Sequence, residues 1–213
     1  MMKPGALLGP AGSRRYSEDV RLFHVKMRAM LIYIHGFNSS SQSGKARELI
    51  SWMYEHGLGE ACVCPDLPDR PAAAIALLEG LIAQSVGPAK LIGSSLGGFY
   101  ATYLAEKQGL KAVLVNPCVN CHEKLAAYAG SAQKNWHSGA EYQFSAAHLD
   151  ELRVLATRPA HPERYLLLLE TGDEVLDYRE AVAAFPGARQ VVLEGGNHGF
   201  ARFTEFLPDI LAF

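Results

Sequence analysis

The sequence predicts an α/β fold in which helices cover both faces of a mostly parallel sheet of about six strands. From residue 30 onward, apolar runs of strand length alternate with segments of helical period. The runs are almost continuously apolar, which is typical of parallel strands that are buried on both faces. A Gly-x-Ser-x-Gly segment, residues 93–97, lies between one such run and the helix after it. Domains of this kind bind ligands beyond the carboxyl ends of their strands.

The strands and helices alternate in a regular order. The predicted strands are residues 30–35, 61–64, 89–93, 111–115, 164–169 and 189–193. Helices are predicted at about 43–57, 71–86, 96–109, 178–185 and from about 201 to the end. Ser43 and Asp177 are the expected N-caps of the first and fourth helices, and Gly109 is expected to end the third.

The gap at residues 116–163 is too long for a bare loop between two strands. Weak helical patterns occur at 122–129 and 145–155. The gap also contains four large aromatic residues, Tyr128, Trp136, Tyr142 and Phe144. We interpret the segment at about 117–160 as a short cap insertion over the strand ends. Ordinary packing of a surface helix pair is the alternative.

Composition restricts the class of protein. The 213 residues are 49% hydrophobic with a formal net charge of −2, which suits one globular domain and lacks the basic excess of a nucleic-acid-binding protein. No apolar run approaches the roughly 18–20 residues that span a bilayer, and no secretory signal peptide is recognisable. We therefore expect a cytoplasmic protein with reduced thiols, no nucleic-acid partner and no membrane span.

Residues 1–28 differ in composition from the rest, with Gly, Pro and charged residues but no sustained period. We predict a poorly ordered N-terminal tail there and a single domain at 29–213, which starts to fold near Met27 or Met30. The weak alternation at 21–26 leaves a short extra strand as the alternative.

Residues 93–97 are typical of a nucleophile elbow, a tight turn that raises a serine hydroxyl above a parallel sheet. The turn needs residues with almost no side chain on either side of the serine, and here these are Gly93 and Gly97. Ser95 lies between them and is the candidate nucleophile, whereas Ser94 is off centre.

A serine becomes a nucleophile when a base accepts its proton and an acid orients that base. In this arrangement the acid and then a histidine follow the serine along the chain. Asp173 follows the fifth predicted strand and His198 follows the sixth, so both are expected at the same sheet edge as Ser95. Asp177 and Glu174 are the alternatives for the acid. For His198 the alternative is an ordinary loop histidine.

The negative oxygen of a tetrahedral intermediate needs fixed backbone donors. We expect one from the amide of Leu96, at a helix N-terminus, and one from Phe37, after a tight turn that Gly36 allows. His35 is expected to make structural hydrogen bonds rather than to serve as a second base. The serines at 39–41 are expected to be loop and cap residues.

The four cysteines raise two other possibilities. Residues 118–122 match the C-x-x-C-H pattern of c-type haem attachment, and Cys62, Cys64, Cys118 and Cys121 have the number of ligands of a zinc site. Haem attachment of this kind would need export, and two of the cysteines fall on a predicted buried strand. We expect core or cap thiols, with neither a metal nor a cofactor.

Four motifs in order, at residues 32–40, 93–100, 171–178 and 195–198, resemble those of the YqiA/YcfP-type bacterial esterases, small members of the α/β-hydrolase superfamily. The resemblance covers roughly residues 30–213. It implies a serine esterase or thioesterase without a cofactor, with Ser95, Asp173 and His198 as nucleophile, acid and base. The chain departs from the family pattern at residues 116–121. The family has no counterpart of residues 1–28.

The sequence therefore predicts hydrolysis of small-molecule carboxylic esters or acyl thioesters through an acyl-Ser95 intermediate. A non-catalytic hydrolase-fold binding protein and an acyltransferase are the alternatives.

Overall fold

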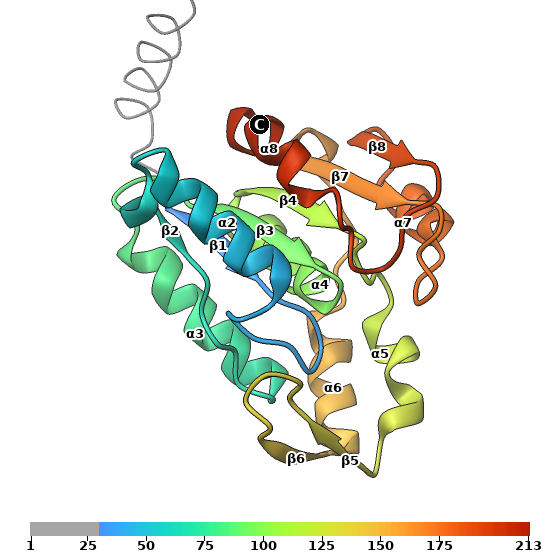
Figure 1. Cartoon of the computed structure of the whole chain (residues 1–213). Helices are drawn as coiled ribbons and strands as arrows, with labels where there is room; N and C mark the ends of the chain where they lie inside the picture. The colour runs from blue at the N-terminus through green and yellow to red at the C-terminus, as the bar shows by residue number, and fades with distance from the viewer. Residues whose placement is uncertain (1–29) are drawn as a thin grey trace, which may run out of the picture.

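The computed structural model describes residues 30–213 and confirms the predicted fold class (Figure 1). Within this part of the chain, parallel strands form one sheet in the order β2-β1-β3-β4-β7-β8. They are β1 (Leu31–Ile34), β2 (Cys62–Val63), β3 (Lys90–Ser94), β4 (Lys111–Val115), β7 (Tyr165–Glu170) and β8 (Arg189–Leu193). The predictions for residues 1–28, including the alternative strand at 21–26, lie outside the described residues.

Helices cover both faces of the sheet, as predicted. They are α2 (Gly44–Glu55), α3 (Pro71–Gln84), α4 (Leu96–Gln108), α5 (Cys121–Lys124), α6 (Ala146–Leu155), α7 (Tyr178–Ala184) and α8 (Leu207–Ala212). Shorter 3₁₀ turns are η1 (Gly59–Ala61), η2 (Ala126–Tyr128), η3 (Pro162–Arg164) and η4 (Phe203–Phe206). Helices α2 and α8 pack on one face, and α3, α4, α6 and α7 on the other. None of the helices within residues 30–213 is long and apolar enough to cross a membrane.

Two predicted elements are shorter in the structure. Strand β2 has two residues, and Cys62 and Cys64 are half-buried rather than buried, because β2 lies at the edge of the sheet. The helix predicted from about 201 is replaced by the 3₁₀ turn η4 and then α8, which begins at Leu207 and has a proline in its first turn.

All three residues predicted to end helices lie at helix ends in the structure. Gly109 ends α4 in the left-handed conformation, with φ +70°. Asp177 caps α7 by accepting a hydrogen bond from the Arg179 amide. Ser43 occupies the N-cap position of α2, as predicted, although its side chain makes no capping hydrogen bond.

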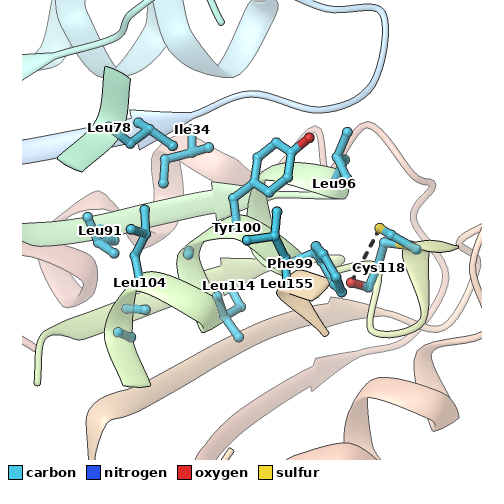
Figure 2. Packing of buried hydrophobic residues seen from close by; sticks show 14 of the residues in the cluster. Ile34, Leu78, Leu91, Leu96, Phe99, Tyr100, Leu104, Leu114, Cys118 and Leu155 are labelled. Atoms are coloured by element: carbon cyan, nitrogen blue, oxygen red, sulfur yellow. Dashed lines mark hydrogen bonds between the residues drawn. The ribbon is translucent and has the colours of Figure 1, made fainter. Parts of the chain in front are cut away.

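The two faces of the sheet are buried in two separate clusters of apolar side chains. Successive strand residues belong to opposite clusters, so Leu91 packs with α3 and α4 whereas Ile92 packs on the side of α2 and α8. Figure 2 shows part of the larger cluster, with Leu91, Leu104 and Leu114 close together. Full burial of one such side chain contributes about 1.5–3 kcal/mol. Burial on both faces explains why the strands are continuous apolar runs.

The insertion between β4 and β7 contains α5, η2, α6 and an antiparallel hairpin of β5 (Ser131–Lys134) and β6 (Glu141–Phe144). Helix α6 lies where a helix was predicted, but the hairpin was not predicted. Figure 1 shows the hairpin at one end of the molecule, next to α6.

Helix α4 begins very close to the carboxyl ends of β1 and β3. A Cβ on Gly97 would overlap the carbonyl oxygen of Ile34, and a Cβ on Gly93 would overlap the carbonyl oxygen of Gly97. Both obstacles are backbone atoms, so the crossing tolerates only glycine at these positions. The contact fixes the first turn of α4 relative to the sheet.

We expect Gly97→Ala to destabilise the fold by about 2–3 kcal/mol, because the new Cβ meets backbone that cannot move aside. Gly80→Ala on α3 is the matched control. Nothing lies within 4 Å of a Cβ there, so alanine should stabilise the helix by about 0.5–1 kcal/mol. Equilibrium unfolding in urea measures both free energies, and similar effects of the two substitutions would contradict the close crossing.

Candidate active site

Ser95 lies at the turn between β3 and α4, with φ +55° and ψ −121°. Positive φ is uncommon for a residue other than glycine, and such strain costs of order 1–3 kcal/mol. The Ser95 amide donates to the Val115 carbonyl (3.1 Å), and the Ser95 carbonyl accepts from the amides of Gly98 (2.9 Å) and Cys118 (3.1 Å). These bonds hold the serine in its strained conformation.

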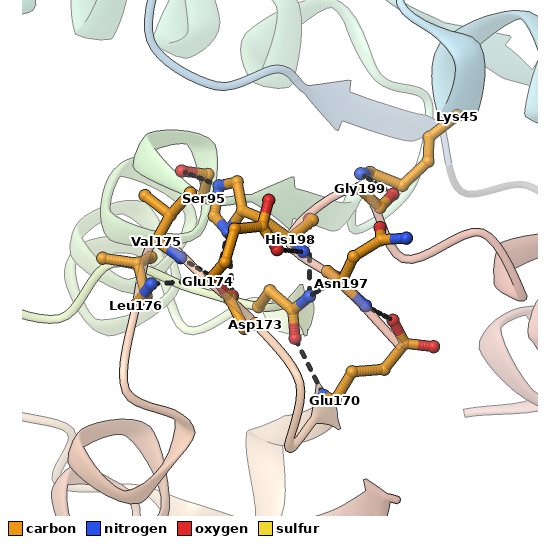
Figure 3. Close-up of polar contacts among 11 residues, drawn as sticks. Lys45, Ser95, Glu170, Asp173, Glu174, Val175, Leu176, Asn197, His198 and Gly199 are labelled. Atoms are coloured by element: carbon orange, nitrogen blue, oxygen red, sulfur yellow. Dashed lines mark hydrogen bonds and ion pairs between the residues drawn. The ribbon is translucent and has the colours of Figure 1, made fainter. Parts of the chain in front are cut away.

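Ser95, His198 and Asp173 are joined by hydrogen bonds (Figure 3). His198 Nε2 is 3.0 Å from Ser95 Oγ, and His198 Nδ1 is 2.8 and 3.0 Å from the two carboxylate oxygens of Asp173. A carboxylate only accepts hydrogen bonds, so Nδ1 carries a proton and Nε2 accepts from the serine hydroxyl. The side chain of Asp173 is 2% exposed and that of His198 22%, so the imidazole ring is accessible and the carboxylate is not.

The surroundings of Asp173 favour its ionised form. Burial raises the pKa of Asp173, but hydrogen bonds from His198 and from the amides of Leu176 (2.8 Å) and Val175 (2.9 Å) lower it by more. The pKa of this carboxyl group therefore lies below its ordinary value. An ionised Asp173 fixes the orientation of the imidazole ring and stabilises a positive charge on it.

Two glutamates hold the backbone of the loop that carries His198 (Figure 3). The carboxylate of Glu170, which is buried at the end of β7, accepts from the Asn197 amide (2.8 Å). The carboxylate of Glu174 accepts from the His198 amide (2.9 Å). Glu174, an alternative for the acid, therefore contacts the backbone of His198, and Asp173 contacts the ring.

Asn116 and Lys45 also make hydrogen bonds to this loop. Asn116 Nδ2 donates to the Asn197 carbonyl (3.1 Å), and Lys45 Nζ donates to the Gly199 carbonyl (2.5 Å). Sequence reasoning did not identify these roles, because the partners lie 81 and 154 positions away in the chain. The only sequence signal was the position of Asn116 directly after a strand.

Two backbone amides beside Ser95, those of Phe37 and Leu96, have no hydrogen-bond acceptor among residues 30–213. Leu96 is the first residue of α4, where a helix leaves its amides unpaired and its dipole is positive. Phe37 follows Gly36, and a Cβ on Gly36 would lie 3.2 Å from Ser95 Cβ. The loop after β1 thus passes directly beside Ser95. Both predicted oxyanion donors, the amides of Phe37 and Leu96, therefore lie next to the serine.

A cavity of about 690 Å³ opens at Ser95 and His198. This volume lies in the range of small-molecule sites. Its wall is largely apolar and includes Phe37, Leu96, Leu125, Tyr128, Trp136, Val175 and Leu176. The insertion between β4 and β7 supplies three of these side chains, which explains why the cavity has a wall on the side away from the sheet.

His35 is buried and makes hydrogen bonds with both ring nitrogens. Its Nε2 accepts from the Leu67 amide (3.1 Å), so its Nδ1 donates to the Gly36 carbonyl (2.9 Å). Burial lowers the pKa of His35, which favours the neutral ring that these bonds require. His35 therefore makes structural hydrogen bonds, as expected from the sequence.

The four cysteines are free thiols in two separate places. Cys118 and Cys121 belong to the core cluster of α4, whereas Cys62 and Cys64 pack against the cluster on the opposite face of the sheet. Within residues 30–213, no group of three or more His, Cys, Asp or Glu side chains is placed to hold a metal ion. The four-cysteine arrangement considered from the sequence is thus not formed.

The chain is similar to known proteins over most of its length. The model of the uncharacterised protein family UPF0227 matches residues 30–213. Mouse alpha/beta hydrolase domain-containing protein 10 is similar in structure, with a TM-score of 0.65, 14% identity, and coverage of 85% of this chain and 87% of that one. A monoacylglycerol lipase of Paleococcus ferrophilus has a TM-score of 0.63 and 16% identity, with coverage of 87% of this chain and 93% of that one. The esterase domain of a Rhodothermus marinus protein has a TM-score of 0.58 and 20% identity, with coverage of 86% of this chain and 85% of that one. These similarities establish the α/β-hydrolase fold.

We expect the difference in stability between the wild type and Asp173→Asn to shrink as the pH falls. The pKa of Asp173 is lowered in the folded chain, so its carboxylate stabilises the fold above about pH 4, the ordinary aspartate value. This contribution is lost as the pH falls through the lower pKa of the folded state.

Urea unfolding of both proteins at pH values from about 6 down to 2.5 measures this difference. Asp150→Asn, which removes an exposed carboxylate on α6, is the control. A difference for Asp173→Asn that does not change with pH would contradict a stabilising role of the ionised form.

Proposed function

The chain belongs to the protein family UPF0227, as its resemblance to the YqiA/YcfP-type esterases predicted, and we propose that it is a serine hydrolase of carboxylic esters or acyl thioesters. The observation that supports this most is the row of hydrogen bonds from Asp173 through His198 to Ser95 Oγ. The esterase domain and the monoacylglycerol lipase that share the fold are named for the same kind of chemistry.

Acylation begins when Ser95 Oγ attacks the carbonyl carbon of the substrate and His198 Nε2 takes the hydroxyl proton. Asp173 stabilises the imidazolium that forms. The carbonyl oxygen becomes negative and accepts from the amides of Phe37 and Leu96, and one such donor typically contributes about 10²–10³ in rate. The bond to the leaving group then breaks, and His198 gives its proton to the departing alcohol or thiol.

Deacylation repeats these steps with water. His198 takes a proton from a water molecule, which attacks the acyl-Ser95 ester, and the same two amides stabilise the second oxyanion. The carboxylic acid leaves, and the proton returns to Ser95 Oγ.

The cavity favours an apolar acyl group. Its wall has aromatic and aliphatic side chains, and burial of each methylene of an acyl chain against such a wall contributes about 0.8 kcal/mol. The substrate class we propose is therefore a small-molecule acyl ester or acyl thioester.

A fluorophosphonate probe, which reacts with activated serines, tests the proposal directly. We expect it to label the wild type at Ser95 and to label neither Ser95→Ala nor His198→Ala. In the same variants, kcat for a p-nitrophenyl ester should fall by about 10⁴–10⁶-fold. Ser51→Ala, at an exposed position on α2, is the control and should be labelled like the wild type.

The result separates the alternatives. A folded wild type that is not labelled would contradict the proposal and favour a non-catalytic binding protein. Labelling together with transfer of the acyl group to added alcohols would identify an acyltransferase. A series of acyl-CoA substrates beside the oxygen esters distinguishes thioesterase from esterase activity.

We expect Leu125→Trp to shorten the acyl chains that the enzyme accepts, because Leu125 is buried in the cavity wall and an indole would fill part of that space. In a series of p-nitrophenyl esters, kcat/KM should fall by about 10-fold or more for the longest chains and change little for the acetate. Val154→Trp, exposed on α6, should leave the profile unchanged. An equal loss for every chain length would contradict an acyl site at Leu125.

A further inference from the structure

The loop after β1 contains a strained residue, Asn38, directly after the candidate oxyanion donor Phe37. Asn38 has φ +54° and lies in a turn of residues 36–39. The hydrogen bond of the turn itself, from the Ser39 amide to the Gly36 carbonyl, is long at 3.3 Å. Asparagine tolerates positive φ better than most residues, but the conformation persists only where the surroundings fix it.

The β5–β6 hairpin makes three hydrogen bonds to Asn38. The Trp136 amide donates to the Asn38 carbonyl (2.9 Å). Asn38 Nδ2 donates to Gln133 Oε1 (2.9 Å), and the Tyr142 hydroxyl donates to Asn38 Oδ1 (2.8 Å). Burial raises the pKa of Tyr142 to about 12, so its hydroxyl keeps the proton that it donates. The side-chain amide of Asn38 is thus held between the two strands of the hairpin.

The hairpin also contacts the residues on either side of Asn38. Asn135 Nδ2 donates to the Ser39 carbonyl (2.7 Å). The ring of Phe37 packs edge-on against Phe144 of β6, with ring centroids 5.5 Å apart. Three consecutive residues of the loop are therefore held by one element, although that element lies about a hundred positions away in the sequence.

The direction of the Phe37 N–H depends on this support. In a trans peptide the N–H points away from the preceding carbonyl, so the Gly36 carbonyl sets the direction of the Phe37 amide. That carbonyl accepts from His35 Nδ1 (2.9 Å) and from the Ser39 amide. The Ser39 amide reaches it only while Asn38 keeps its positive φ. The bonds that hold Asn38 therefore also keep the Ser39 amide on the Gly36 carbonyl. That carbonyl in turn fixes the direction of the Phe37 N–H.

We propose that the β5–β6 hairpin positions the oxyanion donor, with Asn38, Gln133 and Tyr142 as positioning residues that act through the Phe37 amide. The inference rests on the proposed function. It gives the insertion a catalytic role in addition to the substrate contacts of the cavity wall. Loss of the support should weaken stabilisation of the transition state and leave ground-state binding almost unchanged.

Two variants test this in the full chain. Asn38→Gly keeps the freedom for positive φ and removes only the side-chain bonds, and kcat should fall by about 10–100-fold. Tyr142→Phe removes one hydroxyl from a residue outside the wall of the catalytic cavity, and kcat should fall about fivefold. In both, KM should stay within about twofold of the wild type, because the lost interaction acts on the transition state. Gln143→Ala, an exposed glutamine of the same hairpin, is the matched control and should keep the wild-type kcat.

A trifluoromethyl ketone gives an independent measurement, because its adduct with the serine carries the oxyanion. Its inhibition constant should rise in each variant by the same factor by which kcat/KM falls. Variants that keep the wild-type kcat, or whose loss follows a lowered urea midpoint rather than the ketone affinity, would overturn the inference and leave the proposed function intact. A folded wild type that neither hydrolyses esters nor binds the ketone would overturn the proposed function and this inference together.

Discussion

The crossing of α4 over the ends of β1 and β3 determines the geometry of this edge of the sheet. Only glycine fits at positions 93 and 97, because backbone atoms occupy the space that a side chain would need. The crossing forces Ser95 into positive φ and leaves the Leu96 amide unpaired beside it. It also brings the loop after β1 against the serine. One steric constraint thus holds the candidate nucleophile and the Leu96 donor in place and brings the Phe37 loop beside them, where the β5–β6 hairpin supports it.

The candidate acid and the candidate base depend on a further kind of interaction. Asp173 and His198 lie in loops after the last two strands, and each loop has one buried apolar side chain close by, Leu176 and Phe200 respectively. Charged and polar groups hold these loops as well, with Glu170 and Glu174 accepting from backbone amides and Lys45 donating to a carbonyl. Hydrogen bonds to charged groups contribute about 1.5–3 kcal/mol each, so these bonds add to the apolar anchors of the two loops.

The sequence predicted the sheet well because burial on both faces makes each strand a continuous apolar run. The elbow was equally readable, since its glycines lie within five residues of each other. The β5–β6 hairpin was missed because its strands have only four residues each, and β5 contains a single apolar residue, Ala132, so it shows no strand pattern. Its main partner, Asn38, lies about a hundred positions away, and no local pattern encodes such a pairing. The same reason hid the roles of Lys45 and Asn116.

Strands β1 to β4 come from one continuous half of the chain, whereas β7 and β8 join the sheet at one edge and come later in the sequence. A ribosome therefore completes the serine turn and the loop after β1 well before it makes Asp173 and His198. His198 follows Ser95 by 103 positions, and closing that distance costs entropy until β8 has docked. A nascent or half-folded chain therefore carries the Ser95 hydroxyl without its hydrogen-bond partner His198 until the last strand is in place.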